Sequence, residues 1–366
     1  MWLRLRGCFL LASPDNERLC SVSSKMPQRL SIRDLAAQIG VSHTTVSLAL
    51  RNSPRITLAL RKRVQREARR AGYHADPTVS NLMARLRTIR TNAVRETLGF
   101  ITAWPTRNGW REAPNHVRFF DGAARRAREA GYAFDEFWLE ETGMTSRRMS
   151  RILRARGIRG LVLCSLPDPG GRLALEWKHF ACVAKGLTVQ HPPVHRVVSS
   201  HYEDMHLVLL ELARRGYRRV GFVLGEALSA RVDRAWLASC LLHQNDVPKG
   251  GRVPPLITRT PAEEKDFARW FSVHRPEVIL YSEQPVRAWL DRLKVTVPQN
   301  VGLVHLDWSP NLAPLAGLDS DPEMLGEAAI DLLIGQLQAN ELGIPKHEKI
   351  VAVRGHWVEG ATVRRK

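Results

Sequence analysis

The feature that most restricts the fold of this chain is a regular alternation, from residue 97 onward, of short apolar runs with amphipathic helical segments. The expected strands are 98–104, 133–138, 160–164, 196–199, 219–224, 277–281 and 301–306. The expected helices are 119–130, 146–155, 202–214, a segment through Trp236, and 323–338. Strands that are each followed by a helix indicate a doubly wound α/β fold with parallel sheets.

Residues 97–366 make a body that is too long for one hydrophobic core, so we expect two lobes with a ligand cleft between them. No apolar run reaches the roughly 18 residues that a membrane helix needs. The five cysteines are scattered without a C-x-x-C pair, which predicts neither a disulfide framework nor a zinc ribbon. These observations favour a soluble protein of the reducing cytoplasm without membrane contact.

The segment 30–73 differs from the body, because its apolar residues recur at helical spacing with little strand-like alternation. It predicts three short helices capped by Ser31, Ser42 and Thr57, whose side-chain oxygens would accept from free backbone N–H groups. The expected core positions are Ile32, Leu35, Ala36, Ile39, Val46, Leu50, Leu60, Val64, Ala68 and Ala71. The N-terminal head is thus predicted to be all-α with one small core.

A further helix start follows the head, where Asp76 and Pro77 supply a capping side chain and a proline at the first helical position. Its apolar stripe would be Val79, Leu82, Met83 and Leu86. The polar, basic residues up to 96 suit a linker. We therefore expect a helical domain at 26–73, a hinge helix and linker at 74–96, and the body at 97–366.

Residues 1–25 place Arg4 and Arg6 ahead of a short apolar stretch, which weakly imitates a secretory signal. A mis-chosen start codon, with Met26 as the true start, is the favoured interpretation of this non-native extension. A disordered arm and a signal peptide are the alternatives, and the signal peptide conflicts with the rest of the chain.

Basic residues are concentrated ahead of the body. The chain has 55 Lys and Arg against 36 Asp and Glu, a formal net charge of +19. Residues 1–95 hold 18 of these basic residues but only 5 of the acidic ones, so the body is nearly balanced. Such an excess predicts a polyanionic partner for the head.

The segment 30–52, LSIRDLAAQIGVSHTTVSLALRN, resembles the helix-turn-helix of the LacI/GalR family of bacterial transcription regulators. The likeness continues in the Ala-Gly-Tyr at 71–73 and, in the body, in RGYRRVGF at 215–222, PQNVGLV at 298–304 and WVEGAT at 357–362. It covers the chain from about Met26 onward. The resemblance implies a helix-turn-helix head, a hinge helix and a two-lobed periplasmic-binding-protein-like α/β body, and hence a repressor that binds a double-stranded DNA operator as a homodimer.

The second helix of such a head lies in the major groove, where base edges present distinct donor and acceptor patterns. The resemblance makes His43, Thr44 and Leu48 base-facing residues, and Thr45 and Ser47 phosphate contacts. Many relatives carry Arg at the Leu48 position, whereas a leucine contacts only a thymine methyl or excludes a base. The remaining predicted DNA-binding residues are Ser31, Ser42, Arg51, Thr57, Tyr73 and Leu82.

Leu82 falls, counting from Tyr73, where the family pushes an apolar wedge into a minor-groove step. A dimer-packing role is the alternative for Leu82. The alternative for the head is a protein-contact module with Leu48 in its core. The arginines and lysine at 51, 55, 61–63, 66, 69 and 70 either neutralise phosphate or form a solvated face.

Ligands of open α/β sheets bind at the carboxyl ends of strands. The polar and aromatic residues there are Trp104, Thr106, Ser165, Arg231, Asp233, Arg234, Glu283 and Asp307. This mixture suits a sugar, because carboxylates and Arg bond hydroxyl groups while Trp stacks on the ring. The family's effector pattern is incomplete here, since Ser282-Glu283 replaces its Asn-Asp pair. A body that only dimerises, without a ligand, is therefore an open alternative.

Catalysis has no positive support, because no nucleophile-elbow, zinc-protease, phosphate-loop or dinucleotide motif is present. The enzymatic alternative is a sugar-acting catalyst that uses Glu283 or Asp307. His191 and His195 have metal-like spacing, but the two prolines between them exclude a helix that would align both rings. We expect no metal, no cofactor and no enzymatic activity.

Overall fold

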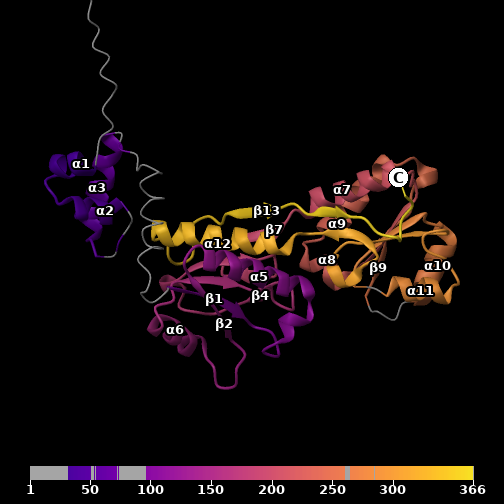
Figure 1. The fold of residues 1–366 in the computed structure, drawn as a ribbon, viewed down its shortest axis with the longest axis horizontal. Coiled ribbons are helices and arrows are strands. Elements are labelled where there is room, and N and C mark those ends of the chain that lie inside the picture. Colours follow the sequence, from indigo (N-terminus) through magenta and orange to yellow (C-terminus); the bar gives the residue numbers. More distant parts are fainter. Residues whose placement is uncertain are drawn as a thin grey trace, which may run out of the picture. The chain divides into compact units, whose positions relative to one another are not determined.

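A helical head and an α/β body are both present in the computed structural model, which confirms the predicted fold class (Figure 1). The structure describes residues 32–50, 53, 55–71, 73, 96–259, 264–283 and 285–365. The head and the body are separate compact units. The predictions for Ser31, Arg51, Leu82, the hinge helix and linker up to residue 95, and the extension at 1–25 lie outside the described residues.

The head contains three helices around one core, namely α1 (Ile32–Ile39), α2 (His43–Leu50) and α3 (Leu58–Arg70). Leu35, Val46 and Val64 are fully buried at its centre. The other core positions expected from helical spacing are buried or packed against this cluster. The periodicity of the apolar residues was therefore sufficient to predict the core of the head.

The predicted caps of the head helices have different outcomes. The Ser42 hydroxyl accepts from the Thr45 N–H at 3.1 Å and so caps α2 as expected. Thr57 stands at the N-cap of α3, but its side chain makes no capping hydrogen bond, so that part of the prediction is wrong. Leu58 beside it is 61% exposed, and water can satisfy the free N–H groups of this open first turn instead.

Lobe 1 of the body is built on a parallel sheet with the strand order β13-β7-β5-β3-β1-β2. Its strands are β1 (Thr97–Thr102), β2 (Ala133–Trp138), β3 (Gly160–Leu163), β5 (Ala181–Lys185), β7 (His195–Ser199) and β13 (Ile350–Val353). Its helices are α5 (Pro114–Glu129), α6 (Ser146–Ala155) and α12 (Pro322–Ala339). A small pair, β4 (Gly171–Arg172) and β6 (Val189–His191), lies beside them.

Lobe 2 has the strand order β14-β12-β11-β10-β8-β9, and only β14 runs antiparallel to its neighbour. The strands are β8 (Val220–Gly225), β9 (Leu256–Thr258), β10 (Val278–Tyr281), β11 (Gly302–His305), β12 (Ala316–Asp319) and β14 (His356–Val358). The helices are α7 (His201–Arg214), α8 (Glu226–Arg231), α9 (Ala235–Asp246), α10 (Glu264–His274) and α11 (Val286–Arg292). The predicted strands and helices are thus present in order, whereas β4, β5, β6, β9, β12, β13, β14, α8, α10 and α11 were not predicted.

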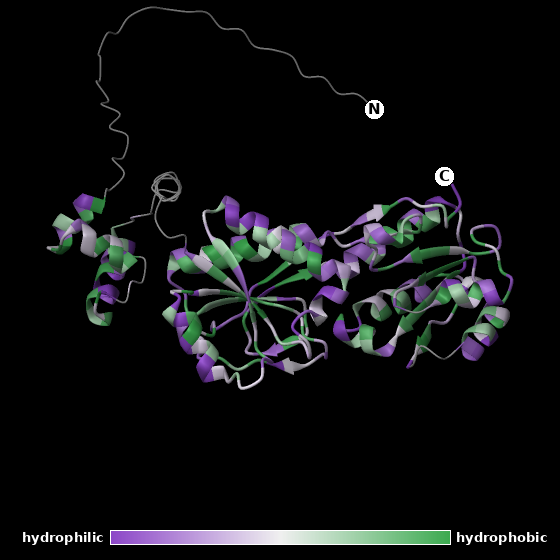
Figure 2. Cartoon of the chain, turned by 60° about the horizontal axis from the view of Figure 1, so that its bottom comes forward, coloured by the Kyte–Doolittle hydropathy of each residue, from purple (hydrophilic) through white to green (hydrophobic). Residues whose placement is uncertain are grey.

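Both sheets are buried on two faces, which explains their nearly continuous apolar strands. Along β3, Val162 joins the cluster under α5 and α12, while Leu161 and Leu163 join the cluster under α6. In lobe 2, Phe222 of β8 faces α7 and α9, and Val223 faces α10. Figure 2 shows the same pattern, with mostly hydrophobic strands inside each lobe and hydrophilic residues on the outer sides of the helices.

Two glycines allow α5 and α12 to pack closely across lobe 1. A Cβ atom at Gly122 would lie 2.2 Å from the carbonyl oxygen of Glu323, and one at Gly326 would lie 2.2 Å from that of Phe119. Larger residues at either position would therefore collide with backbone. Arg126 and Asp331 form an ion pair at 2.7 Å between these helices.

The chain passes between the lobes three times, between β7 and α7, between β12 and α12, and between β13 and β14. The carboxyl ends of the strands therefore meet where the lobes face each other, which is where ligands of such sheets bind.

In the described part of the chain, no helix combines the length and apolar character needed to cross a bilayer.

Candidate functional site

The N-terminal end of α2 presents the residues predicted to read DNA bases. His43 and Thr44 are exposed, and Thr45, Ser47 and Leu48 are half-buried. Leu48 does not belong to the buried cluster of the head. The start of α2 therefore offers a polar, solvent-facing helix end whose first turn is ordered by Ser42.

Side chains of α3 hold the other two helices in place. Arg63 Nη2 donates to the Ile39 carbonyl at 3.1 Å, and Gln65 Nε2 donates to the Ala49 carbonyl at 3.0 Å. These bonds satisfy carbonyl groups at the ends of α1 and α2. Part of the basic character of α3 thus serves the structure of the head, which the sequence reading had left open.

Tyr73 packs partly buried against the core of the head, and its N–H donates to the Ala68 carbonyl at 2.9 Å.

The exposed basic side chains of α3 include Lys62 and Arg66. Arg66 lies 3.5 Å from Glu67, the one acidic residue of α3. The surface of the helix therefore keeps an excess of positive charge.

A cavity of about 150 Å³ lies between the two lobes of the body. Three of the predicted effector residues, Ser165, Arg231 and Asp307, line it. The Ser165 hydroxyl donates to the Lys185 carbonyl at 3.1 Å. The carboxyl ends of β3, β5, β8 and β11 thus supply the wall, as expected for ligand sites of open sheets.

The other predicted effector residues lie elsewhere. Trp104 does not line the cavity but contacts a residue that does, because its Nε1 donates to the Ser165 carbonyl at 2.8 Å. Thr106, Asp233 and Arg234 are exposed and do not line the cavity. Glu283 is exposed and does not line it either, although burial of its carboxyl raises its pKa and the charges of Arg231 and Asp307 act on it.

Four titratable residues of the cavity wall were missed by the sequence reading, namely His116, Lys185, His201 and Asp204. Burial lowers the pKa of Lys185 to about 8 and that of His201 to about 4. Burial raises the pKa of the Asp204 carboxyl to about 6, although this group accepts from the Gly355 N–H. No sequence motif marks these residues, because they come from three separate elements, α5, β5 and α7.

Hydrogen bonds join the lobes across the cavity. Asn115 Nδ2, at the start of α5, donates to Asp307 Oδ1 at 2.6 Å. Arg231 Nη1, from lobe 2, donates to the Leu166 carbonyl of lobe 1 at 2.8 Å and also to the Pro167 carbonyl. The structure therefore shows the two lobes in contact on both sides of the cavity.

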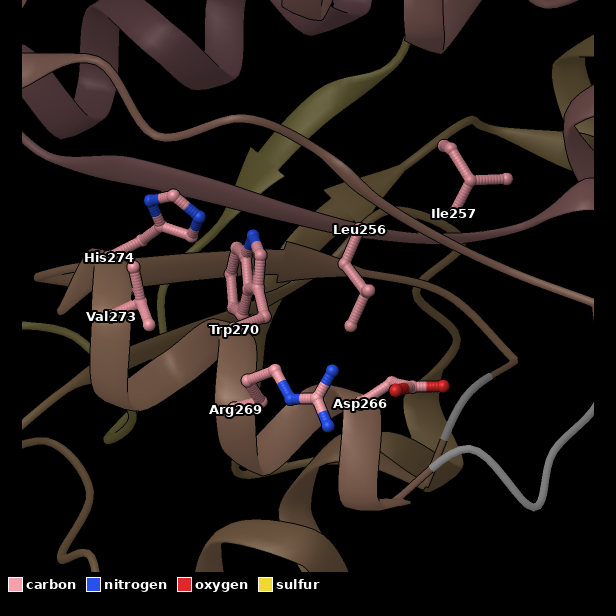
Figure 3. A pocket seen from close by; sticks show the side chains of 7 residues that line it. All are labelled: Leu256, Ile257, Asp266, Arg269, Trp270, Val273 and His274. Carbon is pink, nitrogen blue, oxygen red and sulfur yellow. The ribbon is translucent and has the colours of Figure 1, made fainter.

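A second, more open groove of about 350 Å³ lies on lobe 2, between the edge strand β9 and α10 (Figure 3). Leu256 and Trp270 form its apolar part, and Asp266 and Arg269 are among its polar residues. Trp270 Nε1 donates to the Pro254 carbonyl at 2.7 Å, which fixes the ring. This groove contains none of the predicted site residues.

His191 and His195, whose spacing in the sequence resembles that of metal ligands, do not form a site together. His191 is exposed at the end of β6, whereas His195 is buried in β7 and accepts from the Lys349 N–H at 2.9 Å. Among the described residues, no group of three or more His, Cys, Asp or Glu side chains is arranged to hold a metal ion.

Comparison with known proteins gives two family matches. Residues 31–76 match the bacterial regulatory proteins of the lacI family, and residues 209–363 match a periplasmic binding protein-like domain. A transcriptional regulator of the helix-turn-helix type from Mycolicibacterium smegmatis is 25% identical over 342 residues, which cover 90% of this chain and 83% of the relative.

Solved structures show the same fold. The transcriptional regulator CelR in complex with cellobiose superposes with a TM-score of 0.54 at 17% identity, covering 91% of this chain and 99% of that one. A lac repressor dimer bound to operator and the anti-inducer ONPF superposes with a TM-score of 0.51 at 14% identity, covering 92% and 100%. The chain therefore joins a head that matches the lacI family of bacterial regulatory proteins to a periplasmic-binding-protein-like body, which is the domain combination of a DNA-binding transcriptional regulator.

Proposed function

We propose that this regulator is a cytoplasmic homodimeric repressor that binds a pseudo-palindromic operator and changes its operator affinity when a small carbohydrate-like molecule binds between the lobes. The observation that carries the DNA-binding part is the exposed start of α2, where His43 and Thr44 project from a turn ordered by Ser42. An α-helix presented in this way fits the major groove, and side chains at its N-terminal end reach base edges.

Dimeric binding is supported by the family and by the likeness to a lac repressor dimer bound to operator. Two copies related by a two-fold axis recognise two half-sites in opposite orientation, so the operator should be a pseudo-palindrome. A half-buried Leu48 offers only apolar contact to a base, and one thymine-containing position per half-site is expected there.

The ligand part of the proposal rests on the cavity between the lobes and on relatives whose structures contain cellobiose or ONPF. A ligand changes the affinity for DNA only if it binds one arrangement of the lobes more tightly than the other. By linkage, operator DNA then changes the affinity for the ligand by the same factor. Catalysis is not part of the proposal, because the family is one of regulators.

The first experiment is selection of bound sequences from a random duplex pool, followed by affinity measurements on the selected duplex across a salt series. We expect a palindromic site and an affinity that falls steeply with salt, because phosphate contacts release counterions. Binding that is weak and independent of sequence would contradict the proposal for the head.

Thr44→Ala supplies the matched test of base reading. Loss of a base contact should cost about 1–3 kcal/mol on the selected duplex and leave binding to random duplex nearly unchanged. Thr142→Ala, the same change at an exposed position of the body, is the control and should alter neither affinity. Equal losses on both duplexes would show that Thr44 contributes no specificity.

Leu82, outside the described residues, keeps its proposed role as a minor-groove wedge. Leu82→Ala should reduce both operator affinity and the bend angle of the bound duplex, because an apolar wedge partly unstacks a base step. Unchanged bending, measured by gel phasing, would leave dimer packing as its role.

Calorimetry against neutral sugars and their acidic derivatives tests the effector, and a body that binds none of them would be a ligand-independent dimeriser.

A further inference from the structure

Lys185 is a buried cation on the wall of the interlobe cavity. It is the last residue of β5 and is only 8% exposed. Its Nζ lies 4.8 Å from the centre of the Phe119 ring. Within the described ranges of the body, no carboxylate lies within ion-pair distance of this ammonium group. Burial lowers the pKa of Lys185 to about 8, as expected for a cation without a compensating partner.

Two further nitrogen-bearing side chains share this wall. Arg231 uses Nη1 for the carbonyl groups of lobe 1, and its Nε and Nη2 make no hydrogen bond to any described residue. His116 has a buried Nδ1 without a hydrogen-bond partner among the described residues. Burial lowers the pKa of His116, and the charges of Lys185 and Arg231 lower it further, which places the three groups within electrostatic range of one another.

The carboxylates of the cavity do not neutralise Lys185. Asp307 accepts from Asn115 at 2.6 Å and acts on Lys185 only through its longer-range charge. Asp204 accepts from the Gly355 N–H, and the charge that acts on it from a basic residue is that of Arg354. The wall around Lys185 therefore keeps an unpaired positive charge in a largely desolvated place.

A buried charge without a partner destabilises the folded protein. A neutral side chain of the same length would give a more stable protein, unless a ligand pairs with the charge. Groups of this kind are typical of binding sites. The cavity of about 150 Å³ restricts such a ligand to a small molecule, below the size of most drug-like ligands.

We propose that the cavity between the lobes binds a small hydroxylated anion, whose carboxylate or phosphate oxygens pair with Lys185 Nζ and receive a further hydrogen bond from Arg231. The proposal rests on the proposed function and specifies the chemical class of its effector. The anion replaces the missing partner of Lys185, while Ser165 and Thr188 on the same wall provide hydroxyl groups for the rest of the molecule.

The test is a thermal-shift series on the full chain, with probes that differ only in the anionic group. Glucose, glucuronate and glucose 6-phosphate form one set, galactose and galacturonate form a second, and inorganic phosphate and acetate serve as anion fragments. We expect at least one anion to raise Tm by several degrees in the wild type, about 5 °C for a ligand near 100 times its Kd, whereas the neutral sugars do not.

Lys185→Met removes the charge at nearly constant length, and Lys185→Arg keeps it. Lys249→Met, the same change at an exposed position, is the control. We expect Lys185→Met to abolish the anion-dependent shift and to raise the Tm of the ligand-free protein, Lys185→Arg to keep a reduced shift, and the control to behave as wild type. A purely structural role through the Phe119 ring would instead lower the ligand-free Tm of Lys185→Met.

Operator affinity measured in parallel separates this inference from the proposed function. If a neutral sugar shifts Tm and operator affinity equally in the wild type and in Lys185→Met, the effector function stands and the anionic class is wrong. If no probe shifts Tm while specific operator binding is intact, the inference and the ligand part of the proposed function both fail, and the DNA-binding part stands.

Discussion

At the scale of single residues, the body keeps several polar groups buried with incomplete hydrogen bonding. Asp204 is the clearest case, because it is 1% exposed, one carboxylate oxygen accepts from Gly355, and the other has no partner among the described residues. Its pKa is raised to about 6 by burial. The folded chain therefore holds this proton more tightly than the unfolded chain does.

The pH dependence of stability follows from that difference. The contribution of Asp204 is fully present below its unfolded pKa, near 4, and is lost as the pH rises through about 6. Asp204→Asn is neutral at every pH, so it should be more stable than the wild type at pH 8 by about 1–3 kcal/mol, with the difference shrinking toward pH 5.

Chemical unfolding of both proteins at pH 5, 6, 7 and 8 measures this trend. Asp121→Asn, on the exposed face of α5, is the matched control and should change the unfolding free energy by less than about 0.5 kcal/mol throughout. A constant difference between Asp204→Asn and the wild type across the series would show that Asp204 does not titrate in this range.

At the scale of elements, the pairing of α5 with α12 joins distant parts of the sequence into lobe 1. The helices meet through Gly122 and Gly326, each of which faces the backbone of the other helix, and ion pairs such as that of Arg126 with Asp331 lie beside the contact. Close approach brings Phe119 and Ile330 into the same buried cluster. The position of α12 in lobe 1 thus depends on two residues without side chains.

Gly326→Ala should destabilise the body by about 3 kcal/mol, because the new Cβ would meet the Phe119 carbonyl and the Ala123 backbone nitrogen, which cannot move separately. Gly335→Ala on the same helix is the matched control. Nothing lies within 4 Å of its added Cβ, so the higher helix propensity of alanine should stabilise the protein by about 0.5–1 kcal/mol. Denaturant unfolding distinguishes the two, and equal effects would contradict the proposed packing constraint.

At the scale of the whole body, the two lobes are held by three chain crossings and by side chains that reach across the cavity. Asn115 binds Asp307, while Arg118 of α5 forms a paired bond with Asp319, at 3.0 and 2.9 Å, where β12 ends. These contacts lie beside the cavity between the lobes. Opening of the lobes would therefore break bonds at the edge of the same cavity.

Asn115→Ala removes the interlobe bonds of this amide to Asp307 and to the Trp308 carbonyl, and should favour opening of the lobes by about 1 kcal/mol, or about fivefold. Hydrogen exchange of peptides spanning 165–170 and 305–310 should become faster by that factor. Gln338→Ala, an exposed amide on α12, is the control and should leave exchange unchanged. Unaltered exchange in Asn115→Ala would mean that the bond to Asp307 does not hold the lobes together.

The sequence by itself determined the three-helix head, the order of seven strands and five helices of the body, and the resemblance to the lacI family. Periodicity of apolar residues was enough for the core around Leu35, Val46 and Val64, because local spacing sets which face of a helix is buried. The expected strand order also placed Ser165, Arg231 and Asp307 together, because strand ends in parallel sheets meet at one edge, and all three residues line the cavity.

Only the tertiary structure decided the rest of the cavity. Lys185 ends a strand that was not predicted, and Asp204 and His201 lie in the first turn of a helix, so no local pattern marks them as ligand-facing. Thr106 and Arg234 follow predicted elements yet lie outside the cavity. Which polar side chains line the cavity depends on how the two lobes pack against each other, and that arrangement is set by contacts between residues far apart in sequence.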